Sequence, residues 1–100
     1  MYQAYADFSM GGALWGYAME TSMHVVRLIL SGVFDEFPRL RIVLGHMGEG
    51  LPFWLNRIDT VSSRPGMLNM QRAPSEYFRD NFVITTSAMF WDPLLAFCIS

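Results

Sequence analysis

One histidine and one glutamate, His46 and Glu49, stand in a glycine-rich turn where their side chains could manage protons. The turn follows the β-branched run at 40–44, which is typical of a buried strand, and it precedes a helix predicted from Pro52. It therefore lies at the carboxyl end of a strand, the edge where α/β proteins place their chemistry. We expect Glu49 to accept the Nδ1 proton of His46 and so to leave Nε2 facing a substrate.

A structural interpretation of His46 stays open beside this chemical one. A single histidine at a strand end often serves only to satisfy a turn with its ring nitrogens. Glu49, three residues later, favours proton chemistry, because a carboxylate at that distance can fix the tautomer of the ring. The spacing alone does not decide between the two.

The elements that would position these residues are predicted from hydrophobic periodicity and from the places of Gly and Pro. Gly11-Gly12 indicates a loop over 1–14, and a helix starts near Trp15, with its apolar stripe strongest over 20–31. The remaining segments are a turn or broken helix at 34–38, a strand at 40–44, a helix at 52–60, a loop at 61–73, a helix at 74–80, a strand at 82–86 and a helix over 94–99 whose N-cap is Asp92.

Helices that alternate with strands predict an α/β fold whose strands run parallel through right-handed crossovers. Two strands cannot by themselves form a stable parallel sheet with both faces covered. We therefore expect residues 1–100 to form one partial domain, truncated at both ends, that is a slice of a larger α/β protein.

Composition supports this expectation and argues against some partners. The chain is 52% apolar, and its charged content of 16% lies below the roughly 25% of ordinary soluble domains, which predicts faces covered by other parts of a larger protein. A net charge of −2 argues against nucleic acid and anionic membranes as partners, and no apolar run is long enough to cross a bilayer. A single cysteine, Cys98, predicts a reducing compartment and hence a cytoplasmic location.

Several stretches together resemble a known family. They are 20–28 (ETSMHVVRL), 31–40 (SGVFDEFPRL), 45–49 (GHMGE), 51–52 (LP) and 57–59 (RID), with 85–87 (TTS) and 92–93 (DP) later in the chain. This combination resembles the decarboxylase branch of the amidohydrolase superfamily, which includes aminocarboxymuconate semialdehyde, γ-resorcylate and 5-carboxyvanillate decarboxylases.

The resemblance implies a fold and an activity. The fold would be a fragment of a (β/α)₈ TIM barrel, about strands six and seven with their flanking helices. The whole enzyme would bind one divalent metal, zinc or manganese, remove CO₂ from an aromatic or dienoic carboxylate, and form a homo-oligomer. The family's metal ligands lie on the first, fifth and eighth strands, outside this chain, so we expect the 100 residues alone to be inactive.

The resemblance also assigns roles to three residues. His46 corresponds to a histidine that manages protons beside the metal, Glu49 to the carboxylate that orients it, and Arg57 to an arginine that supports this carboxylate. Protonating a ring carbon would create an electron sink for the departing carboxylate, while the metal offsets charge on the substrate oxygens. The same histidine could activate water, so a hydrolase of the same superfamily stays open. A truncated, inactive product or a fragment that serves only in interactions also stays open.

For the other conspicuous side chains we expect structural roles instead of chemical ones. We expect a structural role for His24, ion pairs for Glu20 and Arg27, solvated loop charge for Arg64 and Arg72, a buried inert thiol for Cys98, and core or interface packing for Trp15, Trp54 and Trp91, of which Trp91 could edge the pocket. The resembled family often has Thr-Ser-Gly where this chain has Ser87-Ala88, a change expected to narrow or reshape the pocket.

Overall fold

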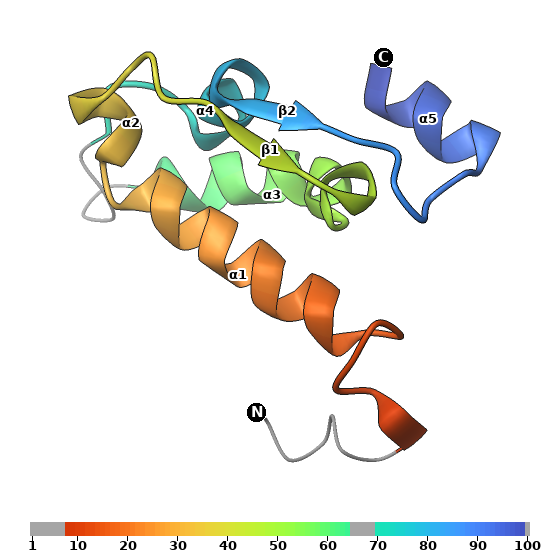
Figure 1. The fold of residues 1–100 in the computed structure, drawn as a ribbon. Helices are drawn as coiled ribbons and strands as arrows, with labels where there is room; N and C mark the ends of the chain where they lie inside the picture. Colours follow the sequence, from red (N-terminus) through yellow and green to blue (C-terminus); the bar gives the residue numbers. More distant parts are fainter. Residues whose placement is uncertain (1–7, 65–69, 100) are drawn as a thin grey trace.

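The computed structural model describes residues 8–64 and 70–99 (Figure 1). Its elements in chain order are α1 (Gly16–Leu30), α2 (Val33–Glu36), β1 (Ile42–Leu44), the short turn η2 (His46–Gly48), α3 (Leu51–Ser62), α4 (Pro74–Asn81), β2 (Phe82–Ile84) and α5 (Asp92–Ile99). The two strands pair in parallel, with Ile42 opposite Phe82 and Leu44 opposite Ile84. The predicted order of helices around two parallel strands is confirmed.

The boundaries differ from the prediction at several ends. Each strand has three residues, and the chain leaves β1 through a tight turn at His46 instead of continuing as a straight ladder. Helix α3 extends from Leu51 to Ser62, two residues into the predicted loop at 61–73. Helix α5 starts at Asp92 itself, because the N–H groups of Leu94 and Leu95 already bond to the Trp91 carbonyl.

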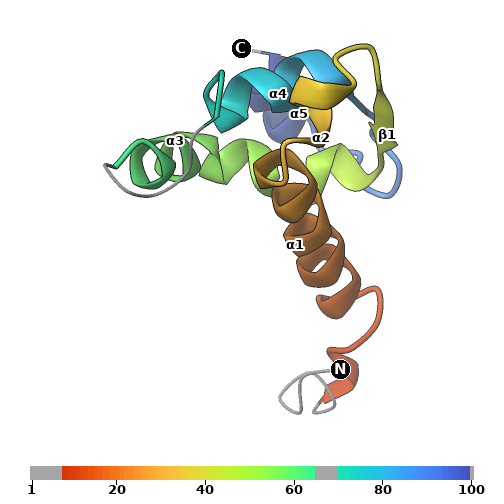
Figure 2. The same cartoon turned by 90° about the vertical axis from the view of Figure 1, so that its left-hand side faces the viewer.

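Helices cover only one face of the strand pair. The buried core joins α1, α2, α3 and α4 to the two strands through Val25, Ile29, Phe34, Leu44, Leu51, Tyr77, Phe78 and Phe82. Val43 and Val83, which pair with each other, are 70% and 46% exposed. Because successive side chains of a strand point to opposite faces, these valines mark the bare face, and Figure 2 shows β1 at the edge of the molecule with the helices to one side. An apolar uncovered face suits the interior of a barrel.

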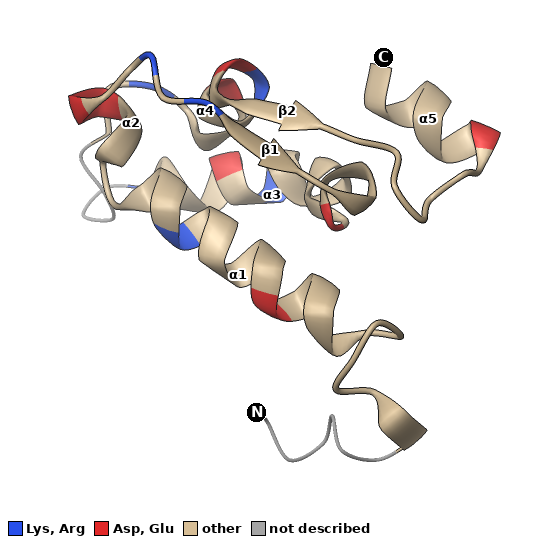
Figure 3. Ribbon diagram, viewed as in Figure 1, with Lys and Arg blue, Asp and Glu red and all other residues tan. Residues whose placement is uncertain are grey.

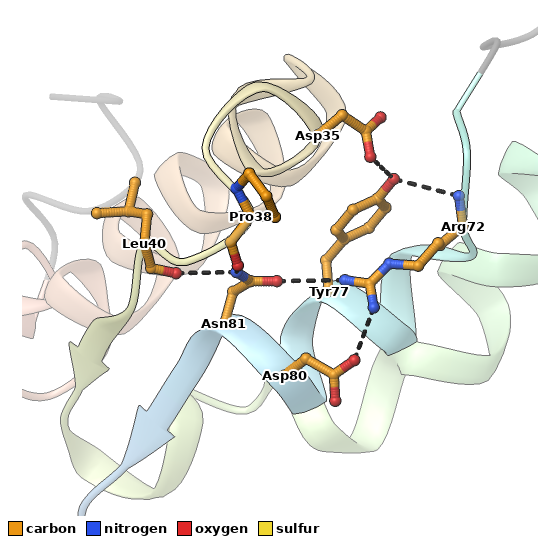
Figure 4. A network of polar contacts seen from close by, with 7 residues as sticks. All are labelled: Asp35, Pro38, Leu40, Arg72, Tyr77, Asp80 and Asn81. Carbon is orange, nitrogen blue, oxygen red and sulfur yellow. Dashed lines mark hydrogen bonds and ion pairs between the residues drawn. The ribbon is translucent and has the colours of Figure 1, made fainter.

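A buried amide fixes the amino ends of both strands (Figure 4). Asn81, only 2% exposed, directly precedes β2. Its Nδ2 donates to the carbonyl oxygens of Pro38 (3.1 Å) and Leu40 (2.8 Å), in the segment that leads into β1. Its Oδ1 accepts a hydrogen bond from Arg72 Nη2 at 3.3 Å. One side chain thus satisfies two backbone carbonyls that the short ladder leaves without strand partners.

Arg72 belongs to this network, so the expectation of a solvated loop charge is wrong. Its Nη1 lies 2.7 Å from Asp80 Oδ2, and its guanidinium carbon lies 4.5 Å from the centre of the Tyr77 ring. The Tyr77 hydroxyl donates to Asp35 and accepts the backbone N–H of Arg72 at 3.1 Å. The hydrogen bond to Asp80 raises the pKa of Arg72, and burial raises the pKa of Tyr77, so the cation and the neutral phenol both persist.

Charged residues gather at this amino end of the strands, in α2, α4 and the segment before β1 (Figure 3). Among the described residues, Glu20 and Arg27 form no ion pair, so that expectation is wrong. His24 and Arg64 are exposed, and the three tryptophans are exposed instead of packed in the core.

Cys98 is only half-buried, and desolvation raises the pKa of its thiol, which favours the unreactive protonated form. None of the described helices has the length and apolar character that a membrane span requires.

The isolated 100-residue chain is expected to self-associate. Within the described residues, β1 and β2 pair only with each other, so each strand has one edge without a strand partner. The exposed Val83 side chain also makes the uncovered face of the sheet apolar. Analytical ultracentrifugation should show oligomers, fewer for Val83→Lys than for Thr60→Lys on the exposed side of α3. A monomeric chain with one cooperative unfolding transition would contradict this expectation.

Replacing Asn81 by Ala is expected to destabilise the full-length protein by about 2–3 kcal/mol, because the carbonyls of Pro38 and Leu40 lose their donors. Urea unfolding followed by circular dichroism measures the change as a lower midpoint. Asn56→Ala, at an exposed position of α3, is the matched control and should leave the midpoint unchanged. Equal midpoints for the two variants would show that Asn81 does not hold the strand ends.

Candidate active site

The turn that carries His46 and Glu49 is left-handed along its whole length. Five consecutive residues have positive φ angles: His46 (51°), Met47 (54°), Gly48 (82°), Glu49 (57°) and Gly50 (81°). For a residue with a side chain this conformation costs roughly 1–2 kcal/mol, so the three such residues of this turn hold strain that the rest of the structure must offset. The glycines allowed a turn to be predicted here, but nothing in the sequence indicated that His46, Met47 and Glu49 share this conformation.

Contacts with the chain after β2 offset part of this strain. The Met47 N–H donates to the Thr85 carbonyl at 2.7 Å, and the Thr85 N–H donates to the Leu44 carbonyl at 2.9 Å. The Met47 side chain is buried. Gly48 is required where it stands, because a Cβ there would lie 2.9 Å from Cδ of Pro52. The turn is therefore fastened to the carboxyl end of β2 as well as to β1.

The hydrogen bond of the His46 ring reverses one prediction. Its Nδ1 lies 2.8 Å from the carbonyl oxygen of Ser87, and a carbonyl can only accept. Nδ1 therefore carries the proton, and its partner is Ser87 instead of Glu49. The Glu49 carboxylate lies on the other side of the ring, with Oε1 at 3.8 Å from Nε2. The expected pairing of Glu49 with Nδ1 is wrong, because a backbone carbonyl far along the sequence takes that place.

His46 and Glu49 differ sharply in exposure. The His46 side chain is 52% exposed, whereas that of Glu49 is 5% exposed. An imidazole that reaches solvent can exchange protons with a ligand, and the buried carboxylate lies beside its Nε2. The pair therefore has the arrangement of a proton donor and acceptor at the carboxyl end of two parallel strands.

Arg57, the third predicted residue, does not join this pair. It lies exposed on α3, along an apolar groove lined by Leu30 and Trp54. Across residues 8–64 and 70–99 it forms no ion pair with Glu49. The catalytic role of Arg57 stays a prediction.

Ser87 is the site residue that sequence reasoning missed. Its Oγ accepts the backbone N–H of His46 at 3.1 Å, in addition to the bond between its carbonyl and the ring. The available signal was the run at 85–87, which ends one residue beyond the predicted strand at 82–86 and directly follows the observed β2, much as the turn at His46 follows β1. Phe90 and Trp91 follow Ser87 within four residues and are largely exposed. Two aromatic side chains therefore lie close in sequence to the carboxyl end of β2.

The described residues do not form a metal site. No three His, Cys, Asp or Glu side chains within 8–64 and 70–99 lie together as a metal ion requires. His46 and Glu49 alone supply too few ligands for a divalent cation. Any metal that serves this site must therefore be held by other parts of a protein.

Comparisons with known proteins agree with the predicted resemblance. The sequence model of the family described as Amidohydrolase matches residues 2–98. The γ-resorcylate decarboxylase of Rhizobium sp. is 49% identical over 82 residues, which make up 79% of this chain and 25% of that enzyme.

Two solved structures share the fold over nearly the whole chain. The 5-carboxyvanillate decarboxylase of Sphingomonas paucimobilis has a TM-score of 0.89 and 50% identity, over 97% of this chain and 30% of that one. The 5-carboxyvanillate decarboxylase of Novosphingobium aromaticivorans, complexed with manganese and 4-hydroxy-3-methoxy-5-nitrobenzoic acid, has a TM-score of 0.88 and 35% identity, over 98% and 30%. The chain thus spans less than a third of the length of these relatives, and the predicted fragment of a (β/α)₈ barrel is confirmed.

Ala88 offers a test of the backbone geometry beside Ser87. Its φ of 58° is left-handed, so Ala88→Gly is expected to raise the free energy of unfolding of the full-length protein by about 0.5–1 kcal/mol. Ala96→Gly, inside α5, is the matched control and should lower it by about 1 kcal/mol. Urea midpoints measure both, and a loss of stability in Ala88→Gly would contradict the left-handed assignment.

Proposed function

Because this chain belongs to the amidohydrolase family and its relatives include decarboxylases, we propose that it supplies the proton-handling part of a metal-dependent carboxy-lyase. The proposed substrate is an aromatic carboxylate, and the proposed product is the arene together with CO₂. The observation that carries the proposal is the exposed His46 imidazole, held at the carboxyl end of β1 with Nε2 at 3.8 Å from the buried Glu49 carboxylate.

The proposed chemistry follows from the needs of the reaction. Direct loss of CO₂ from an aryl carboxylate would leave an electron pair on a ring carbon with no way to disperse it. When the His46 imidazolium first delivers its Nε2 proton to the ring carbon that bears the carboxylate, the ring becomes an electron sink. The C–C bond then breaks, its electron pair restores the aromatic ring, and CO₂ leaves. The proton replaces the carboxylate, and His46 regains a proton from solvent.

Glu49 serves this cycle by orienting His46. Its buried carboxylate lies 3.8 Å from Nε2, on the side of the ring opposite the Ser87 carbonyl. The buried position keeps this carboxylate from reaching the substrate directly. We infer that Glu49 acts on the reaction through His46. The supporting role proposed for Arg57 requires a contact with Glu49 that α3 does not make in the described residues.

A divalent metal, manganese by analogy with the Novosphingobium relative, would hold the phenolate and carboxylate oxygens of the substrate and offset their charge. The described residues of this chain do not bind it, so its ligands would come from other strands of the barrel. We also propose a homo-oligomeric, cytoplasmic protein. The single cysteine suits a reducing compartment, and the exposed apolar groove along α3 suits a subunit contact.

Of the alternatives, a hydrolase would use the same His46 to activate water. The relatives named above are decarboxylases, which favours CO₂ release. An inactive or purely interacting product is separated from both by assay. The full-length, manganese-loaded protein would be offered aromatic carboxylates and lactones in parallel.

His46→Asn in the full-length protein is expected to lower the rate of CO₂ release from γ-resorcylate or 5-carboxyvanillate by at least about 10²-fold, because the proton donor is lost. The bound manganese, measured by elemental analysis, should be unchanged. His24→Asn, an exposed histidine on α1, is the matched control and should keep full activity. Turnover at the original rate in His46→Asn would refute the catalytic assignment, and a wild-type protein that cleaves only lactones would replace the decarboxylase by a hydrolase.

A further inference from the structure

Ser87 holds His46 at two points, one on the main chain and one on the ring. Its Oγ accepts the His46 backbone N–H at 3.1 Å, and its carbonyl oxygen lies 2.8 Å from Nδ1. The two residues are 41 positions apart, on the segments that follow β2 and β1. We propose that Ser87 is a positioning residue that selects the His46 tautomer and aims Nε2 at the substrate. This inference rests on the proposed function of His46.

The tautomer follows from the acceptor. A neutral imidazole has one N–H, and the Ser87 carbonyl accepts it at Nδ1, which leaves the lone pair on Nε2. When Nε2 gains a proton, the imidazolium keeps its Nδ1 bond to Ser87 and carries the new N–H on Nε2, whose distance from Glu49 Oε1 is 3.8 Å. Both protonation states therefore use the same ring orientation. Proton transfer through Nε2 needs no rotation of the ring, because Ser87 holds the other side throughout.

The hydroxyl of Ser87 is itself fixed. It lies 3.1 Å from Thr85 Oγ1, so it can accept the N–H of His46 and donate to Thr85. Gly45 leaves room for this arrangement, because a Cβ at that position would lie 3.1 Å from Ser87 Oγ and 3.7 Å from Thr85 Oγ1. A small group of neighbouring residues thus places one hydroxyl where the main chain of His46 needs an acceptor.

The strained backbone explains why this acceptor matters. His46 has a φ of 51°, a conformation that a residue with a side chain keeps only when other contacts impose it. Without the Ser87 hydroxyl, the His46 N–H has no partner and the left-handed turn loses an anchor. The ring would then be free to leave the Ser87 carbonyl and to adopt either tautomer.

The test uses Ser87→Ala and Ser87→Thr in the full-length protein, with Ser63→Ala as the matched control. Among residues 8–64 and 70–99, Ser63 Oγ bonds only to the Thr60 carbonyl at the end of α3, so its loss leaves the site intact. Steady-state kinetics would be measured with manganese. The ¹⁵N shifts of the His46 ring nitrogens would be measured on the zinc-loaded protein, because zinc is diamagnetic.

We expect a single tautomer with Nδ1 protonated in the wild type and in Ser63→Ala. In Ser87→Ala both tautomers should appear, kcat should fall about tenfold, and KM should change less than twofold. Ser87→Thr, which keeps a hydroxyl, should restore both readouts. A wild-type tautomer together with wild-type kcat in Ser87→Ala would overturn the proposal, and so would a threonine variant as defective as the alanine variant.

The outcomes separate this inference from the proposed function. If the wild-type protein releases no CO₂ but Ser87→Ala still mixes the tautomers, the decarboxylase proposal fails and the positioning role stands. If the wild type is active and the tautomer of Ser87→Ala is unchanged at full kcat, the decarboxylase stands and the positioning role fails.

Discussion

The parallel pairing of β1 with β2 continues beyond the strands, and the candidate site depends on that continuation. Thr85 donates to the Leu44 carbonyl, Met47 donates to the Thr85 carbonyl, and Ser87 then takes both the backbone N–H and the ring of His46. The first of these bonds reaches back to the last residue of β1, and the others join the segments that follow the two strands. The register that sets Leu44 opposite Ile84 therefore also decides what His46 can contact.

The amino and carboxyl ends of the strand pair differ in the interactions that hold them. At the amino end, Asn81 and Arg72 form a satisfied polar network in which each charged or amide group has a partner, which suits an end that serves stability. At the carboxyl end, the chain carries left-handed strain and a half-exposed histidine above a buried carboxylate. The stable end keeps the strands aligned, so that the strained end can hold its geometry.

Local sequence patterns predicted the strands, the helices between them and the meeting of His46 with Glu49, since these features depend on periodicity and short spacing. They did not predict which ring nitrogen faces Glu49, because the competing acceptor, the Ser87 carbonyl, lies 41 residues away. Arg72 was misjudged for the same reason: its position in a loop gave no sign of the aromatic ring and carboxylate that receive it. Arg57 shows a different limit. The family resemblance assigned it to Glu49, but a shared motif does not by itself establish a contact between two side chains.

The distance in sequence between His46 and Ser87 also sets an order of assembly. During synthesis the turn at His46 emerges well before β2 and the segment that follows it, so its left-handed backbone has no anchor when it first leaves the ribosome. Short-range interactions alone disfavour that conformation, and the partners that impose it close a long loop. His46 can therefore take its final orientation only after the second strand has docked, which makes the candidate site one of the last features of this segment to form.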